Sequence, residues 1–144
     1  MATHALKTTM KLIDDKIKMV SQVSGKPDIT TDYFPPLGTG DGYTPLELTL
    51  ISLSTCLSTT LLTILRHGMK KEVKALSATA EGVQREEMPR ILTDMRVAID
   101  IDAEDLTREE VDAALKRTEQ VCPVWNMLRE GLDIDVSYQL NQRS

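Results

Sequence analysis

The stretch TPLELTLISLSTCLSTTLLTILRHG, residues 44–68, decides the fold because it predicts one long helix. Thr44 can cap the first turn, Pro45 suits the first helical position, and Glu47 completes a capping box. At the other end, Gly68 can adopt the left-handed conformation that commonly ends a helix. Both ends of this helix are therefore predicted from local sequence signals.

The interior of this stretch carries no charge from Leu48 to Leu65, although a surface helix normally has a charged face. Nine of these residues are Leu or Ile, with Ser and Thr interspersed. That many hydroxyl groups argue against a membrane span and favour a helix that is buried on nearly all sides inside a protein. A chain of 144 residues has difficulty covering such a helix alone. We therefore expect a second copy to cover it in an intimate homodimer.

Length and composition limit the classes of function. The chain of 144 residues suits a single domain, residues 1–144, and its formal net charge of −5 argues against nucleic-acid binding. The N-terminal sequence MATHALKTTMKLIDDK lacks the uninterrupted apolar segment of a signal peptide, which favours a cytoplasmic protein without a membrane partner. In that compartment, two cysteines are more often reduced or redox-active than joined in a structural disulfide.

Alternating apolar and polar residues predict strands on both sides of the long helix. Before the helix, three short strands form a meander, and after it two strands form a hairpin. A last strand ends the chain. The expected strands are 9–13, 17–23, 29–33, 73–85, 90–101 and 132–140. With the helices, this order predicts an α+β fold.

A second helix is predicted between the hairpin and the last strand. Thr107 and Glu110 form another capping box. An apolar stripe with helical spacing follows and ends at Cys122, which we expect to face the interior. Pro123 then interrupts the helix, and a short second piece over residues 125–128 should end at Gly131.

The two cysteines, Cys56 and Cys122, are the leading candidates for chemistry. A lone cysteine on an apolar helix is more often a small core residue than a nucleophile. Here, hydroxyl residues surround Cys56, and Cys122 directly precedes a proline on a face that points to the same core. These features favour a redox pair.

Other kinds of site have less support. His67 lies eleven residues beyond Cys56, ~16 Å along the helix, and His4 lies near the terminus, so neither a metal site nor a Cys–His hydrolase is expected. The glycines in FPPLGTGDGY, residues 34–43, lack the spacing of a nucleotide fingerprint. We expect no metal and no cofactor.

The pattern TPLEL and STC in one helix, followed by VCPVWN at residues 121–126, resembles the OsmC and organic hydroperoxide resistance family. The resemblance runs from about Tyr43 to the C-terminus. It implies an OsmC-like fold and an intertwined homodimer, in which sheets from both chains wrap the long central helices. It also implies that the two cysteines lie near each other at the subunit interface.

The resemblance further implies a peroxidase involved in oxidative stress. Cys56 would attack an organic hydroperoxide as a thiolate and become a sulfenic acid. Cys122 would resolve this acid to a disulfide, which a dithiol such as a lipoyl group would reduce. A sulfenic acid condenses readily with an adjacent thiol, so the order of steps is chemically sound.

The sequence departs from the peroxidases of this family at two positions. They carry a glutamate directly after the helix-starting proline, where this chain has Leu46, and Glu47 matches only the next position. They also use an arginine from the N-terminal strands, whereas no arginine precedes Arg66 here. Lys18 or Lys26 can offer only a point charge without the bidentate fork of arginine.

Two hypotheses therefore remain. In the first, Cys56, Cys122 and Glu47 are the catalytic residues of a weakened hydroperoxide reductase. In the second, the chain is a non-peroxidase member of the family, in which Cys56 lines a pocket for a small apolar ligand or performs other thiol chemistry. Hydroperoxide consumption that depends on cysteine and a dithiol would distinguish the first from the second.

Overall fold

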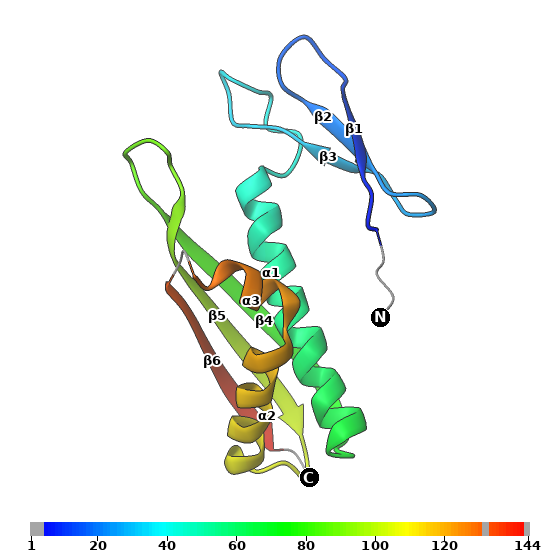
Figure 1. The fold of residues 1–144 in the computed structure, drawn as a ribbon, viewed down its shortest axis with the longest axis vertical. Helices are drawn as coiled ribbons and strands as arrows, with labels where there is room; N and C mark the ends of the chain where they lie inside the picture. Colours follow the sequence, from blue (N-terminus) through cyan, green and yellow to red (C-terminus); the bar gives the residue numbers. More distant parts are fainter. Residues whose placement is uncertain (1–4, 131–132, 143–144) are drawn as a thin grey trace. The chain divides into compact units, whose positions relative to one another are not determined.

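The computed structural model describes residues 5–130 and 133–142 and confirms the α+β class (Figure 1). The chain forms two compact units, Met1–Leu48 and Thr49–Ser144. Each unit is described by itself below.

The N-terminal unit contains the predicted meander. Strands β1 (Thr9–Leu12), β2 (Met19–Gln22) and β3 (Ile29–Thr31) pair antiparallel in that order. The first hairpin is closed by Asp14, whose carboxylate accepts the backbone N–H groups of Lys16 and Lys18 at 2.9 and 3.0 Å. These bonds explain why β1 ends earlier and β2 begins later than their apolar pattern predicts, since the polar turn takes up the residues between them.

A buried carboxylate, Asp32, holds the segment rich in proline and glycine that follows β3. Its Oδ1 accepts the N–H of Tyr33 at 2.8 Å. Its Oδ2 accepts the hydroxyl and the N–H of Thr39 at 2.6 and 3.1 Å, and the N–H of Asp41 at 3.3 Å. A Cβ at Gly38 would lie 2.2 Å from Oδ1, so a side chain there would displace the carboxylate. The hydrogen bond from the Thr39 hydroxyl is the largest of the effects that lower the pKa of Asp32 to about 2, and the backbone N–H groups add to it.

We predict that Asp32→Asn loosens this loop. The amide keeps one acceptor oxygen and turns an NH₂ donor towards groups that themselves donate. Because the pKa of Asp32 lies below its ordinary 3.8, the carboxylate stabilises the loop at neutral pH, and that contribution is lost as the pH falls towards 2. Hydrogen exchange at the amides of Thr39 and Asp41 should therefore be faster in Asp32→Asn. Asp28→Asn is the matched control, and equal exchange in both variants would contradict the prediction.

Helix α1 (Pro45–Thr63) begins as its sequence predicts. The N–H of Thr44 donates to Oε1 of Glu47 at 2.7 Å, and the N–H of Glu47 donates to Oγ1 of Thr44 at 3.3 Å. This reciprocal pair is a capping box. The start of α1 is thus fixed by the residues at its own end.

The far end of α1 differs from the prediction. The helix continues into a π-helical segment, η1 (Ile64–Gly68), in which the N–H of Met69 donates to the carbonyl of Ile64 at 2.9 Å. Gly68 has no positive φ, and the left-handed residue is Lys70, with φ of 57°. The prediction of a left-handed Gly68 is wrong because the wider π turn carries the helical ladder past that glycine.

The C-terminal unit contains a sheet of three strands with one parallel pair. Strands β4 (Val73–Gln84) and β5 (Leu92–Ala103) form the predicted hairpin, and β6 (Asp133–Gln142) runs parallel to β5. Leu132, where the last strand was expected to begin, lies outside the described residues. Alternate residues of β5 are buried as predicted, whereas Ile91 lies before the strand and is 42% exposed.

Two further helices lie along this sheet (Figure 1). Helix α2 (Arg108–Val121) starts at the predicted capping box of Thr107 and Glu110. Helix α3 (Pro123–Leu128) follows after one residue. It ends where the N–H of Arg129 donates to the carbonyl of Trp125 at 2.9 Å, and Gly131 lies outside the described residues.

The core of the C-terminal unit consists of one side of β5 and one stripe of each long helix. Its fully buried members include Leu53, Leu57, Leu61, Leu65, Met95, Ile99, Ile101, Leu106 and Val111. On α1 and η1, the four buried leucines recur every fourth residue, and the other faces are partly or largely exposed in the single chain. Burial of α1 on nearly all sides therefore requires a second copy and stays a prediction.

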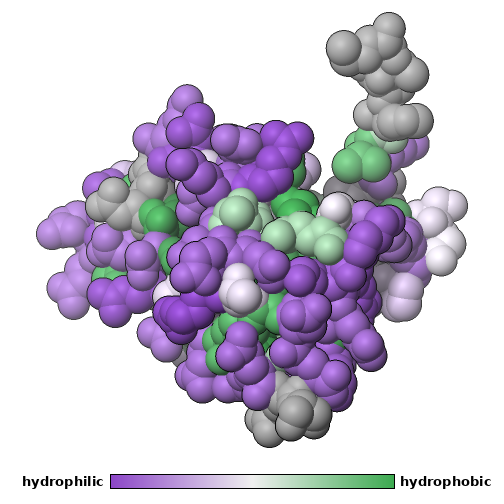
Figure 2. All heavy atoms as spheres, turned by 90° about the horizontal axis from the view of Figure 1, so that it is seen from below, coloured by the Kyte–Doolittle hydropathy of each residue, from purple (hydrophilic) through white to green (hydrophobic). Residues whose placement is uncertain are grey.

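The segment Pro45–Gly68 is long and apolar enough to cross a membrane by length and composition alone. The core helix of a soluble protein meets the same criteria, and a buried leucine stripe is typical of such a helix. On the face in Figure 2, hydrophilic residues predominate and hydrophobic ones are visible in separate patches.

Candidate redox site

Helix α1 carries Cys56 beside its buried leucine stripe. Leu53 and Leu57 are fully buried, and Cys56 itself is partly exposed. Neighbouring hydroxyls bond back to the preceding turn, as in Thr55, whose Oγ1 donates to the carbonyl of Ile51 at 2.7 Å. The hydroxyl-rich sequence around the cysteine is thus compatible with a regular helix, as expected.

The junction between α2 and α3 carries Cys122, whose side chain is fully buried. Its φ of −68° and ψ of 116° are extended, because Pro123 disfavours the helical conformation in the residue before it. The N–H of Cys122 still donates to the carbonyl of Thr118 at 2.8 Å. The cysteine therefore ends one helix and precedes the next.

The structure brings the two cysteines together across 66 residues of sequence, with both thiols free. The Sγ of Cys122 lies 3.4 Å from the Sγ of Cys56. A disulfide needs a separation of ~2.05 Å, so a shift of little more than an ångström would join them. Their arrangement permits thiol–disulfide chemistry within one chain.

The environment of Cys122 distinguishes the two sulfurs. Burial raises the pKa of its thiol above the ordinary value of 9.0, and the neighbouring sulfur of Cys56 raises it further. The backbone N–H groups of Trp125 and Val124 act in the opposite direction, but burial is the largest effect. At neutral pH, Cys122 is therefore a protonated thiol that donates to the sulfur of Cys56.

The side chain of Glu47, the third candidate, forms part of the capping box of α1. Its carboxylate accepts the N–H of Thr44 at 2.7 Å. It precedes Cys56 by nine residues, which is ~14 Å of helix rise. Within one chain, the capping bond is the role that the structure gives to Glu47.

The lysine and arginine residues near the sequence motifs have partners of their own. Lys18 Nζ lies 2.7 Å from Oδ2 of Asp41, and this hydrogen bond raises the pKa of Lys18. Arg66 donates to the carbonyl of Val73 at 3.0 Å. The guanidinium of Arg129 lies 5.4 Å from the centre of the Trp125 ring, close enough for a cation–π contact.

Sequence reasoning missed Asn126, whose side-chain amide is bonded to the backbone on both sides of the helix junction. Its Nδ2 donates to the carbonyls of Glu119 and Cys122 at 2.9 and 2.8 Å. Asn126 is the last residue of the VCPVWN motif, four positions after Cys122, but the motif assigned it no role. The bond depends on how the chain turns at Pro123, so the spacing alone did not identify it.

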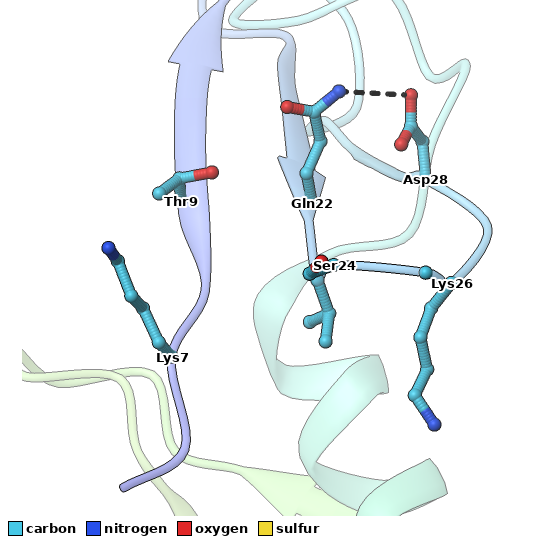
Figure 3. A pocket seen from close by; sticks show the side chains of 8 residues that line it. Lys7, Thr9, Gln22, Ser24, Lys26 and Asp28 are labelled. Carbon is cyan, nitrogen blue, oxygen red and sulfur yellow. Dashed lines mark hydrogen bonds between the residues drawn. The ribbon is translucent and has the colours of Figure 1, made fainter.

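A pocket of about 460 Å³ lies in the N-terminal unit, lined by residues of β1, β2 and the following turn (Figure 3). Gln22 donates to Asp28 at 3.5 Å, and the side chains of Lys7 and Lys26 point in different directions. The pocket lining includes no cysteine or histidine. Among the described residues, no group of three or more His, Cys, Asp or Glu side chains is placed to hold a metal ion.

Several solved structures share this fold. An OsmC-like protein from Mycoplasma pneumoniae is 20% identical, with a TM-score of 0.84, and the match covers 97% of this chain and 99% of that one. A hypothetical protein from Aquifex aeolicus VF5 is 20% identical, with a TM-score of 0.84 and coverage of 99% and 100%. An organic hydroperoxide resistance protein from Elizabethkingia anophelis, bound to thiocyanate, is 18% identical, with a TM-score of 0.70 and coverage of 99% of both chains.

At these identities, the solved structures establish the fold alone. No curated protein matches the chain. A family model described as OsmC-like protein matches residues 38–137, which include both cysteines and most of the helical and sheet structure. The chain therefore belongs to the OsmC-like protein family.

Proposed function

We propose that this protein is a thiol peroxidase that reduces organic hydroperoxides through Cys56 and Cys122. The observation that carries the proposal is the 3.4 Å separation of the two free sulfurs. Membership of a family whose structural relatives include organic hydroperoxide resistance proteins supports a redox role. The chemistry needs only two thiols, a peroxide and a dithiol reductant.

In the first step, the thiolate of Cys56 attacks the terminal oxygen of the hydroperoxide. A sulfur–oxygen bond forms, the oxygen–oxygen bond breaks, and the alcohol leaves after it takes up a proton. Cys56 is now a sulfenic acid, oxidised by two electrons. The partial exposure of Cys56 is consistent with this role, because the substrate must reach its sulfur.

In the second step, the sulfur of Cys122 attacks the sulfur of the sulfenic acid. The sulfur–sulfur bond forms, the sulfur–oxygen bond breaks, and water leaves with the proton of Cys122. A small dithiol then reduces the disulfide to two thiols by exchange. Burial of Cys122 supports this assignment, because a buried protonated thiol is a poor partner for peroxide but is already beside Cys56.

The proposal predicts a Cys56–Cys122 disulfide after treatment with one equivalent of cumene hydroperoxide. Two sulfurs 3.4 Å apart should form the bond without a large rearrangement. Peptide mapping under non-reducing conditions should show the cross-linked peptide, and dithiothreitol should remove it. Two unmodified thiols after this treatment would rule out the peroxidase.

We also propose that the active form is a cytoplasmic homodimer and that residues 1–144 form one OsmC-like domain. The family match at residues 38–137 spans the boundary between the two units, which supports the single domain. Apart from the buried leucine stripe, the charge-free faces of α1 are partly or largely exposed in one chain, which supports the dimer.

The dimer is predicted to bury an apolar interface of more than ~2,000 Å², as obligate homodimers do. Sedimentation velocity at micromolar concentration should give a single species of twice the chain mass of 16.1 kDa. A folded monomer that is uniform across the same concentrations would contradict this prediction. Far-ultraviolet circular dichroism of the same samples establishes whether the protein is folded.

A second candidate function is thiol redox chemistry with a substrate other than a peroxide. Leu46 replaces the family glutamate, and Lys18, one of the two upstream lysine candidates, is paired with Asp41. These features favour slow attack on peroxide. A protein whose cysteines exchange with a disulfide such as oxidised lipoamide, but do not consume cumene hydroperoxide, would support this alternative.

A further inference from the structure

The junction between α2 and α3 has an unusual hydrogen-bond arrangement. In a continuous helix, the carbonyl of Glu119 would accept the N–H of the residue four positions later. That residue is Pro123, which has no N–H. The side-chain amide of Asn126 donates to this carbonyl instead, at 2.9 Å. Asn126 therefore replaces the bond that Pro123 removes.

The same amide nitrogen also fixes the backbone of Cys122. The carbonyl of Cys122 accepts Nδ2 of Asn126 at 2.8 Å and the backbone N–H of Asn126 at 3.1 Å. On its other side, the N–H of Cys122 donates to the carbonyl of Thr118 at 2.8 Å. The peptide groups before and after Cys122 are thus both held, although its own conformation is extended.

We propose that Asn126 is a positioning residue that keeps the sulfur of Cys122 within reach of Cys56. This inference rests on the proposed function only in requiring that the two cysteines form a disulfide. The side-chain amide ties the last turn of α2 to the start of α3. These two hydrogen bonds set the direction of the Cα–Cβ bond of Cys122 and thus the position of its sulfur.

Loss of the Asn126 side chain should affect only the step that joins the two sulfurs. A sulfenic acid at Cys56 either condenses with the thiol of Cys122, releasing water, or reacts with a second peroxide molecule to give a sulfinic acid and an alcohol. Without Asn126, the junction can rotate and Cys122 spends less time beside Cys56. The balance between these fates should then shift towards over-oxidation.

The test compares Asn126→Ala and Asn126→Asp with the unmodified protein. Aspartate is close in shape to asparagine but cannot donate, and its charge opposes two carbonyls. Gln120→Ala is the control, because Gln120 is an exposed residue of α2 whose side chain bonds only to Arg117 among the contacts described. After excess cumene hydroperoxide, mass spectrometry measures the ratio of disulfide to over-oxidised Cys56. We expect this ratio to fall about tenfold in both Asn126 variants, since small misplacements slow intramolecular reactions strongly.

A second oxidant makes the test independent of peroxide reduction. Diamide takes two electrons and two protons from a pair of thiols and becomes a hydrazine, leaving a disulfide. If the unmodified protein does not react with peroxide, the peroxidase proposal fails, and diamide still measures how readily the cysteines join. An unchanged diamide rate in both Asn126 variants, or an unchanged disulfide ratio with peroxide, would overturn the role of Asn126.

The double variant Pro123→Ala/Asn126→Ala separates positioning from general stability. Alanine at 123 restores a backbone N–H for the carbonyl of Glu119, but the carbonyl of Cys122 still lacks its side-chain donor. We expect the midpoint of thermal unfolding to rise relative to Asn126→Ala, with disulfide formation slower than in Pro123→Ala alone, which shares the loss of the proline that keeps Cys122 extended. Recovery of the Pro123→Ala rate together with stability would show a merely structural effect and overturn the proposal.

Discussion

Replacement of Cys56 by serine is expected to abolish hydroperoxide reduction. A serine hydroxyl is not ionised near neutral pH and cannot form the sulfenic acid, so no oxidised intermediate can pass to Cys122. The rate of cumene hydroperoxide consumption with excess dithiol should fall by at least ~10³-fold, to that of the reductant alone. A ferrous–xylenol orange assay of the remaining peroxide measures this change.

The matched variant, Cys122→Ser, should behave differently. Cys56 remains able to react once, but its sulfenic acid has no partner thiol and proceeds to sulfinic or sulfonic acid. Mass spectrometry should show two or three added oxygen atoms on the peptide that contains Cys56. Unchanged peroxide consumption in Cys56→Ser, or the loss of all reaction at Cys56 in Cys122→Ser, would contradict the proposed roles.

The parts of the fold that the sequence predicts well are those determined by neighbouring residues. The capping boxes of Thr44 with Glu47 and of Thr107 with Glu110 both form at the expected positions. Each needs only residues three positions apart. The same reason explains the alternation of buried residues in β5, where a period of two follows directly from strand geometry.

The parts that the sequence did not predict depend on the position of distant segments. The π turn at η1 replaces the simple glycine stop at Gly68, and β6 pairs parallel with β5, from which it is separated by two helices. No local pattern encodes either feature. The choice of partner strand depends instead on which arrangement buries the apolar side of β5 beneath the helices.

The candidate site shows the same division. A cysteine in the long helix and another at the end of the second helix could be recognised locally, but the 3.4 Å between their sulfurs could not. The bond from Asn126 to the carbonyl of Glu119 also depends on how the chain turns at Pro123. Glu47 illustrates the converse, because the local capping signal describes its contact better than the family pattern does.

The largest effect on stability is expected from Leu57→Ala in α1. Leu57 is fully buried in the leucine stripe, one residue from Cys56, so its truncation leaves a cavity that the surrounding sheet and helices can fill only in part. We expect the free energy of unfolding to fall by about 2–5 kcal/mol. Urea denaturation of both proteins at one concentration, followed by circular dichroism, measures the difference.

Met88→Ala is the control, because Met88 is 80% exposed in the turn between β4 and β5 and its truncation removes apolar atoms without emptying a core site. Met88→Ala should change the free energy of unfolding by no more than about 0.5 kcal/mol, as most surface substitutions do. A cost at Leu57 no greater than at Met88 would mean that the leucine stripe of α1 does not hold the C-terminal unit together. The pairing of Cys56 with Cys122 would then also lack its rigid support, because the stripe that packs α1 into the core begins one turn before Cys56 and continues beyond it.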